Sequence, residues 1–372
     1  MQLLEHIKEQ IRNFGPMSFD QFMHQALYTP NSGYYTGPLP KIGMAGDFIT
    51  APEISNMFAK ALANQCQQVL DTLHNPIIFE FGAGNGQLCV DLLLHLAHLD
   101  SLPMAYHVLE ISADLKAQQQ SLIQSQLPAD LAARVHWLSE WPKQTFQGVV
   151  LANEVLDAMP VHRFLYANTE VFEGYIKLGE NDDLEEVYLP CSDLSLKDYV
   201  LTNFPQNIDA PYQSEVNLFI DGWFQQCSVM LARGLMLIID YGFPRHEYYH
   251  ADRCSGTLMC HYKHQAHSNA LINVGSQDIT AHVDFTHVAE SAFSAGFQVS
   301  GYTSQAAFLL NNGLMEECLA IPDETTRIFT QQAVKKLIQP HEMGELFKVI
   351  ALTKDLQLEL NGFKMFDRRA RL

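Results

Sequence analysis

Apolar and polar positions follow two periods along this chain, and the stretch around residues 76–96 shows both. The run from Pro76 to Phe81 is apolar apart from one acid and has the length of a buried strand. Beyond the glycines that follow it, leucines recur at the three- and four-residue steps of an amphipathic helix, at Leu88, Leu92, Leu93 and Leu96. The pattern therefore predicts a strand, a glycine-rich turn and a helix in succession, which is the repeating unit of α/β proteins.

The same patterns predict the rest of an α/β fold with a seven-stranded sheet. Six further apolar runs have strand length: Met104–Glu110, Arg134–Leu138, Gln147–Asn153, Leu235–Asp240, Phe297–Tyr302 and Leu346–Thr353. Helical periodicity predicts helices at 1–14, 19–27, 113–127 and 214–233, among others.

Four segments follow from this reading. Residues 1–75 form a helical N-terminal extension with a lid, and residues 76–162 form the first part of the core. Positions alternate between apolar and polar over much of 163–192, which predicts an inserted α+β region, β-rich over 163–212, with a polar linker at 197–209. Residues 213–372 complete the core sheet and carry an inserted aromatic and histidine-rich loop at 243–282.

The glycine spacing in the first turn separates two classes of cofactor. A dinucleotide fingerprint needs a third glycine three residues after the second, where this chain has Gln87, and no Gly-Lys-Ser/Thr phosphate loop occurs anywhere. The pattern Glu-x-Gly-x-Gly-x-Gly resembles the first motif of class I S-adenosylmethionine-dependent methyltransferases, a Rossmann-like fold. An ordinary glycine-rich turn is the alternative. The predicted cofactor contacts in this motif are Glu80, Gly82, Ala83, Gly84 and Gly86.

Two other segments are candidates for holding the cofactor. Glu110 ends the second predicted strand, and an ionised carboxylate accepts hydrogen bonds only, which suits the two hydroxyls of a ribose. Its alternative is a solvated charge at the start of a helix. The segment 43–55 is rich in small residues and predicts either a lid over the ligand, with contacts from Asp47 and Phe48, or a plain connecting loop.

Acids and an amide follow the fourth predicted strand. Ligands of open α/β sheets bind beyond the carboxyl ends of the strands, and Asn153, Glu154 and Asp157 stand at such an end. We predict that these three residues are catalytic and that Asn153 also contacts the cofactor. The alternative for Asp157 is to cap a following helix.

The 243–282 loop offers further candidates. A loop this long without clear periodicity is usually functional, and its aromatic residues interleave with histidines, which predicts an aromatic substrate channel. Cysteine and histidine spacing matches no zinc pattern, so no metal is predicted. The candidate substrate contacts of this region and of the strand before it are Asp240, Tyr241, Tyr248, His264 and His282.

Charge and cysteine usage restrict the class of protein. Lys and Arg number 23 against 42 Asp and Glu, a net charge of −19, which disfavours a nucleic-acid binder and fits a cationic substrate. The seven cysteines contain no CxxC pair, which predicts reduced thiols in a cytosol-like compartment. The first residues lack a signal-peptide core, and no apolar run has transmembrane length, so membrane insertion is not expected.

Six ordered segments together resemble the MidA family, the bacterial counterpart of a mitochondrial methyltransferase needed for respiratory complex I assembly. They are Thr29–Tyr35, Gly46–Ser55, Glu80–Gly86, Asn153–His162, Ile239–Gly242 and Gln277–Phe285. The resemblance implies a class I core, S-adenosylmethionine as cofactor, and dimethylation of an arginine in a core subunit of NADH:quinone oxidoreductase by a cytoplasmic bacterial enzyme.

Under that hypothesis, Glu154 and Asp157 clamp the substrate guanidinium and direct its charge away from the attacking nitrogen. Two rival functions remain open. One is a methyltransferase acting on another protein or a small molecule. The other is a non-catalytic assembly factor that binds S-adenosylmethionine or nothing.

Overall fold

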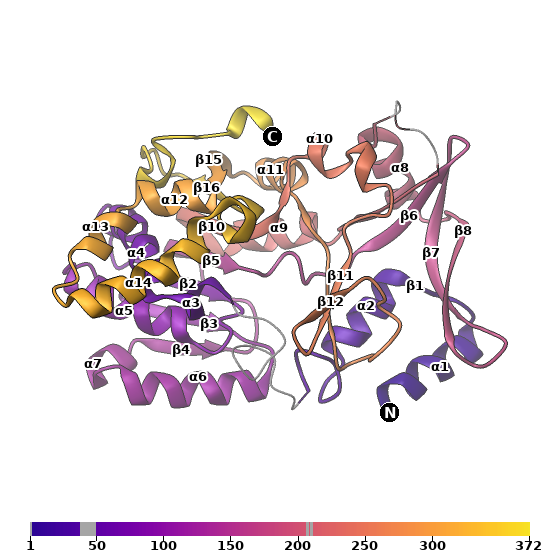
Figure 1. The fold of residues 1–372 in the computed structure, drawn as a ribbon, viewed down its shortest axis with the longest axis horizontal. Coiled ribbons are helices and arrows are strands. Elements are labelled where there is room, and N and C mark those ends of the chain that lie inside the picture. Colours follow the sequence, from indigo (N-terminus) through magenta and orange to yellow (C-terminus); the bar gives the residue numbers. More distant parts are fainter. Residues whose placement is uncertain (1, 38–49, 206–207, 209–210) are drawn as a thin grey trace. The chain divides into compact units, whose positions relative to one another are not determined.

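The computed structural model describes residues 2–37, 50–205, 208 and 211–372 (Figure 1). The chain divides into two compact units, each built from three separate segments. One unit contains residues 1–48, 157–220 and 243–284, and the other contains 49–156, 221–242 and 285–372. We call the second the core unit and the first the insert unit, and each is described by itself.

The core unit is built on a mixed sheet of the predicted seven strands. Its strand order is β15-β16-β10-β5-β2-β3-β4, and in Figure 1 the labels follow one another in this order from β15 near the top to β4 below. The strands are β2 (Ile77–Phe81), β3 (Ala105–Leu109), β4 (Val135–Leu138), β5 (Phe146–Asn153), β10 (Leu231–Phe243), β15 (Gln298–Ser304) and β16 (Phe347–Lys354).

Neighbouring strands from β10 to β4 are parallel, and β16 alone runs antiparallel to both of its neighbours. The parallel strands are buried on both faces, so they read as continuous apolar runs, and β2 is buried at all five positions. The register aligns the carboxyl ends of three strands, because Phe81 lies opposite both Leu109 and Ala152. Everything that follows these ends therefore shares one edge of the sheet.

Helices cover the faces of this sheet. The main ones are α3 (Ala51–Ile54), α4 (Asn56–Leu70), α5 (Gln87–His98), α6 (Ala113–Gln126), α7 (Ala129–Ala132), α9 (Ile220–Met230), α11 (Phe285–Ser294), α12 (Gln305–Asn311), α13 (Leu314–Leu319) and α14 (Glu324–Ile338). Short helical turns also occur at Pro340–Gly344, Asn361–Phe363 and Arg369–Arg371. One hydrophobic cluster joins α4, α5, α12 and α14 to alternate residues of the sheet, such as Ile78, Leu151 and Leu237.

The insert unit contains a five-stranded antiparallel sheet. Strands β1, β7, β6 and β9 lie in that order and β8 pairs with β7. Its elements are α1 (Gln2–Phe14), β1 (Met17–Ser18), α2 (Phe19–Tyr28), β6 (His162–Ala167), β7 (Glu170–Leu178), β8 (Leu184–Pro190), α8 (Leu194–Asn203) and β9 (Tyr212–Val216). The predicted β-rich insert and the two N-terminal helices are thus present.

Three local predictions were wrong. The segment 197–209, expected as a polar linker, contains most of α8, whose buried Leu196 and Val200 pack against β-strand residues. The helix expected over 214–233 begins only at Ile220, because Tyr212–Val216 pairs with β6 as strand β9.

The 243–282 segment is not an irregular loop, and its structure is the third correction. It contains α10 (Arg245–Tyr248), the turn Ala251–Arg253, and a small antiparallel sheet of β11 (Met259–Tyr262), β12 (Gln265–His267) and β13 (Asp278–Thr280), followed by β14 (Val283–Asp284). Strands of three or four residues are too short to show a period in the sequence.

Two features bear on cellular context. All seven cysteines lie in described segments and are free thiols. None of the helices in the described parts of the chain combines the length and the apolar character needed to cross a bilayer.

Candidate functional site

The glycine turn after β2 has a left-handed backbone. Gly82, Gly84 and Gly86 have φ angles of 58°, 56° and 93°, a region that other residues rarely adopt. Gly82 is exposed and Gly84 is half-buried, whereas Gly86 is buried at the start of α5. A Cβ on Gly86 would lie 3.3 Å from Gln119. The turn therefore presents bare backbone at Gly82 and Gly84, while Ala83 points into the hydrophobic cluster.

Glu80 is the last acid before this turn and is 2% exposed. Its Oε2 accepts a hydrogen bond of 2.7 Å from the hydroxyl of Tyr106 on β3. Burial raises the pKa of Glu80 to about 7, against the Tyr106 hydrogen bond, which lowers it. Glu80 thus ties β2 to β3 beneath the turn, and its predicted contact with a cofactor stays a prediction.

Glu110 follows β3 and belongs to a buried hydrogen-bond network. Its Oε1 accepts from the backbone N–H of Ser112 at 2.8 Å, and its Oε2 accepts from Gln119 Nε2 at 2.9 Å. Gln119 Nε2 also donates to the carbonyl of Gly84 at 2.8 Å, and its Oε1 accepts from Trp137 Nε1 at 2.8 Å. A carboxylate accepts hydrogen bonds only and has about four acceptor sites, which suits the two hydroxyls of a diol, and the contact of Glu110 with a ribose stays a prediction. The solvated helix-start charge is excluded, since Glu110 is 9% exposed.

Gln119 is a residue that the sequence reasoning missed. It is completely buried on α6, on the face that also buries Leu115 and Ile123. A glutamine at the four-residue step between two buried apolar residues was the available signal. Its amide joins the glycine turn after β2 to the acid after β3, so one side chain fixes both parts of the site relative to each other.

Asn85 connects the turn to α3. Its Nδ2 donates to Glu53 Oε1 at 2.8 Å, and its Oδ1 accepts from the backbone N–H of Gln87 at 2.9 Å. Glu53 also accepts from the backbone N–H of Thr50, which completes a capping box at the start of α3. The predicted lid residues Asp47 and Phe48 lie outside the described residues.

The loop after β5 is held by the end of β10. The backbone N–H of Glu154 donates to the carbonyl of Ile239 at 2.9 Å, and the N–H groups of Val155 and Leu156 donate to Asp240 Oδ2 at 3.2 and 3.0 Å. Asp240 is completely buried, and its Oδ1 accepts from the N–H of Tyr241 at 2.9 Å. These contacts give Asp240 the task of fixing the loop; its predicted contact with substrate stays a prediction.

Glu154 has a φ angle of 54°, an uncommon backbone conformation for a residue other than glycine. Such outliers persist where the surroundings hold them, and they cluster at functional sites. Its Oε1 accepts from Asn153 Nδ2 at 3.2 Å. The Oδ1 of Asn153 is buried and accepts no hydrogen bond from the described residues, so the amide has an acceptor that a bound ligand can satisfy.

Asp157 begins the insert unit, whereas Glu154 belongs to the core unit. Asp157 is 5% exposed, and its backbone carbonyl accepts from the N–H of Ala281 at 3.0 Å. Residues 154–161 form turns and lead directly into β6. The alternative in which Asp157 caps a following helix is therefore wrong, and its catalytic role stays a prediction.

The remaining substrate candidates have different surroundings. In the core unit, the Tyr241 ring packs edge-on against Phe347 at 5.5 Å. In the insert unit, His264 is exposed at the tip of the β11–β12 hairpin. The ring of His282 packs edge-on against Phe243 at 5.3 Å.

Tyr248 belongs to a packed hydrophobic cluster with Phe164, Phe204 and Tyr249, and it is 3% exposed. Tyr248 and Tyr249 are thus packed into a core, and the aromatic substrate channel stays a prediction.

The strand order with one antiparallel strand, the left-handed glycine turn and the acid after the next strand define a class I methyltransferase. Residues 61–303 match the model of the family described as S-adenosyl-L-methionine-dependent methyltransferases, and the chain belongs to this family. This confirms the family resemblance and the fold class.

Known proteins similar to the whole chain agree with this family. A protein from Burkholderia thailandensis, solved bound to S-adenosyl-homocysteine, is 38% identical with a TM-score of 0.95, covering 100% of this chain and 96% of that one. The mouse mitochondrial protein arginine methyltransferase NDUFAF7 is 28% identical, covering 94% of this chain and 84% of the relative. The Drosophila melanogaster NDUFAF7 homolog is 27% identical over the same shares.

The cofactor is S-adenosylmethionine, and the site fits it. Gly82 and Gly84 have a left-handed backbone and no Cβ, Glu110 would accept from the hydroxyls of a diol, and Asn153 would offer a buried amide oxygen. When bound, the cofactor supplies a methyl group on a positively charged sulfur, which is already electrophilic. The protein's own residues therefore have to bind, orient and shield rather than activate it.

Proposed function

We propose that this protein is a protein-arginine N-methyltransferase of the cytoplasm whose substrate is a core subunit of bacterial respiratory complex I. Support comes from relatives that span nearly the whole chain and are named as protein arginine methyltransferases. The net charge of −19 is favourable for capturing a cationic segment of a protein. The shared family alone supports only methyl transfer, so the arginine specificity needs an observation within the site.

That observation is the fixed backbone of Glu154. Hydrogen bonds from three successive N–H groups, at Glu154, Val155 and Leu156, reach Ile239 and Asp240 of β10 and hold the acid in its left-handed conformation. The same loop passes close to the glycine turn after β2, because a Cβ added to Gly82 would lie 3.8 Å from Val155 Cγ2. The backbone that carries the Glu154 carboxylate is thus held close to the turn that we expect to bind the methyl donor.

A guanidinium needs such a group, because it stays protonated in water and is a poor nucleophile. A carboxylate can accept two of its N–H groups, which orients the plane of the guanidinium and draws positive charge toward the bonded nitrogens. The nitrogen that attacks the methyl group then carries less of the charge. In this proposal Glu154 makes that contact, and Asp157, three residues further along the chain, supplies a second carboxylate and accepts the proton released after transfer.

The test compares proteomes of the source bacterium with the gene intact, deleted, and replaced by Glu154→Gln. Mass spectrometry should find an arginine in a complex I subunit that is dimethylated in the first strain and unmodified in the other two. Purified enzyme with isotope-labelled S-adenosylmethionine should restore the mark on complex I from the deletion strain.

Other outcomes would contradict the proposal in distinct ways. A lost mark on a protein outside complex I would leave the methyltransferase activity and refute the substrate. A mark that survives in the Glu154→Gln strain would refute the role of this acid. If no methylation depends on the gene while complex I still fails to assemble in its absence, the protein acts as a non-catalytic assembly factor.

A further inference from the structure

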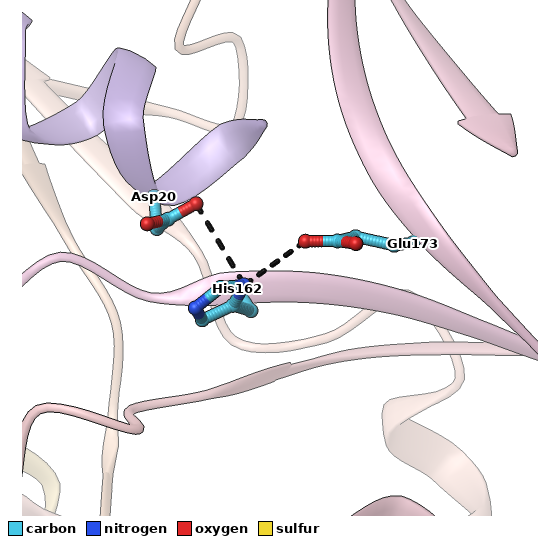
Figure 2. Close-up of side chains that lie close together, drawn as sticks. All are labelled: Asp20, His162 and Glu173. Atoms are coloured by element: carbon cyan, nitrogen blue, oxygen red, sulfur yellow. Dashed lines mark hydrogen bonds and ion pairs between the residues drawn. The ribbon is translucent and has the colours of Figure 1, made fainter. Parts of the chain in front are cut away.

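Three side chains that are far apart in the sequence meet in the interior of the insert unit. Asp20 lies in the first turn of α2, His162 begins β6, and Glu173 lies on β7 (Figure 2). His162 Nδ1 is 3.0 Å from Glu173 Oε1 and 3.7 Å from Asp20 Oδ1. One atom from each residue can be chosen so that all three lie within 4.8 Å of one another. Their side chains are 10%, 11% and 3% exposed, respectively.

The cluster contains more negative than positive charge. Among the described residues, no lysine or arginine forms an ion pair with either carboxylate. Even with a protonated imidazole, two buried carboxylates face one positive charge, and burying an uncompensated charge is unfavourable.

Hydrogen bonding does not satisfy the cluster either. Both carboxylate oxygens of Glu173 have a hydrogen-bond partner, because Oε1 faces His162 Nδ1 and Oε2 accepts from the hydroxyl of Tyr175 at 2.9 Å. Asp20 Oδ1 is buried and receives no hydrogen bond from any described residue. His162 Nδ1 lies 3.7 Å from Asp20 Oδ1, which is beyond hydrogen-bond distance, and 3.0 Å from Glu173 Oε1, which is within it. Among the described residues, the acceptor Asp20 Oδ1 therefore has no donor, and it lies 3.7 Å from the histidine nitrogen.

We propose that Asp20, His162 and Glu173 bind a divalent transition-metal ion. The donor set is one imidazole nitrogen and two carboxylate oxygens, which suits Mn²⁺, Fe²⁺, Co²⁺ or Zn²⁺. With metal–ligand distances of about 2.1 Å, ligands at a right angle lie about 3.0 Å apart and tetrahedral ones about 3.4 Å apart. The two separations from His162 Nδ1, 3.0 and 3.7 Å, lie close to that range, and all three ligand atoms lie within 4.8 Å of one another.

An ion at this position would both balance the excess negative charge and give Asp20 Oδ1 a partner. Two positive charges balance the two carboxylates while the imidazole binds in its neutral form, and Asp20 Oδ1 gains a ligand. Tyr175 then serves as the outer partner that orients Glu173, as residues around metal ligands commonly do. The ion would join α2 to β6 and β7 within the insert unit, which indicates a role in stability. Sequence spacing rules could not find this site, because its ligands are contributed by positions 20, 162 and 173.

The test uses untagged full-length protein, stripped with a chelator that is then removed, and titrated with Mn²⁺. Free Mn²⁺ is counted by electron paramagnetic resonance, and the melting temperature is followed by circular dichroism. Wild-type protein should bind one equivalent with a dissociation constant in the micromolar range or below, and its melting temperature should rise by several degrees. Mn²⁺ is chosen because it has little affinity for the free thiols.

Conservative variants locate the site. Asp20→Asn, His162→Gln and Glu173→Gln should each weaken binding at least 100-fold and abolish the thermal shift. Tyr175→Phe leaves all three ligands in place and should weaken binding about tenfold, in the range for outer partners of metal ligands. The matched controls are Glu170→Gln, an exposed acid on the same strand, and His246→Gln, an exposed histidine; both should bind as the wild type does.

Three results would overturn the proposal. Wild-type protein that binds no Mn²⁺ below millimolar concentration would show that His162 is an imidazolium held by two carboxylates. Binding that survives in all ligand variants would place the ion elsewhere. A Co²⁺ complex whose spectrum shows thiolate-to-metal charge transfer would also exclude this site, which contains no cysteine. If a ligand variant fails to fold, the wild-type titration and Tyr175→Phe still decide the matter.

Discussion

Gln119 Nε2 lies 2.9 Å from Glu110 Oε2 and donates a hydrogen bond to it. The same nitrogen donates to the carbonyl of Gly84 at 2.8 Å, so a single amide on α6 supports the two sequence motifs expected to hold the cofactor. Both hydrogen bonds are shielded from solvent, because Gln119 is completely buried. The affinity of the site for its cofactor should therefore depend on Gln119, even if Gln119 does not contact the cofactor.

Replacing Gln119 by Leu should weaken binding of S-adenosylhomocysteine about tenfold. The change removes the donors that connect Glu110 to the Gly84 carbonyl, so the acid and the glycine turn are no longer held relative to each other. A tenfold loss of affinity corresponds to about 1.4 kcal/mol. Calorimetric titration measures the affinity. Gln118→Leu is the matched control, since Gln118 is the exposed neighbour on the same helix. If the affinity is unchanged in the Gln119 variant, the hydrogen bonds of Gln119 do not contribute to cofactor binding.

Glu80 should make the cofactor-free protein less stable as pH rises from about 5 to 7.5. Its pKa is raised from 4.5 to about 7 by burial, so the folded state holds a proton that the unfolded state has lost. The stabilising contribution is full below about pH 4.5 and disappears as pH passes through 7. The difference of about 2.5 units corresponds to on the order of 3 kcal/mol.

Urea unfolding at a series of pH values measures this effect. In Glu80→Gln the side chain is neutral throughout, so the slope between pH 5 and 7 should be smaller than in wild type. The exposed acid Glu140 provides the control, and Glu140→Gln should leave the slope as it is. Parallel curves for Glu80→Gln and wild type would show that Glu80 is ionised in the folded state throughout.

Glu154→Gln should separate cofactor binding from methyl transfer. It keeps the size of the side chain and removes the charge that, in our proposal, contacts the substrate guanidinium, while Gly82, Gly84 and Glu110 remain. We expect S-adenosylmethionine affinity within a factor of about two of wild type, and a loss that falls in kcat more than in KM, as for a group acting mainly in the transition state.

Asp157→Asn tests the second carboxylate in the same assay. Since no helix follows Asp157, a helix-capping effect on stability is no longer expected. Single-turnover methylation and melting temperature should be measured together on both variants. Full turnover in both would exclude the carboxylate clamp. Loss of stability with normal turnover in Asp157→Asn would make Asp157 a structural acid of the insert unit, where it is 5% exposed.

Asp240→Asn should destabilise the protein by about 1–3 kcal/mol and lower kcat as well. The carboxylate accepts from the N–H groups of Val155, Leu156 and Tyr241, and an amide nitrogen in its place would face donors with a donor. Because two of these bonds hold the loop that contains Glu154, turnover should fall even at temperatures where the variant is folded. Asp252→Asn, at a side chain 91% exposed, is the control. If the Asp240→Asn variant has lower stability but normal kcat, Asp240 does not act by positioning Glu154.

The sequence by itself determined the core sheet, the glycine turn after β2 and the class of protein. Strands buried on both faces must be apolar along their length, so runs such as 77–81 and 235–240 were visible without any knowledge of their partners. The turn was equally visible, because glycine is the residue that adopts a left-handed backbone readily, and Gly82, Gly84 and Gly86 all do so. Burial of a strand and a left-handed turn each depend on residues that are adjacent in the sequence, so both can be predicted from it.

Only the tertiary structure decided which polar side chains meet. The spacing around Gln119 indicates that it is buried, but not that its amide reaches Gly84 and Glu110. Residues 20, 162 and 173 come together because α2 and two strands of the inserted sheet pack in one unit. The short strands at 259–280 escaped prediction for a related reason, since a strand of three or four residues is stabilised by its partners rather than by its own pattern. Hydrogen bonds between distant segments depend on geometry that no local period encodes.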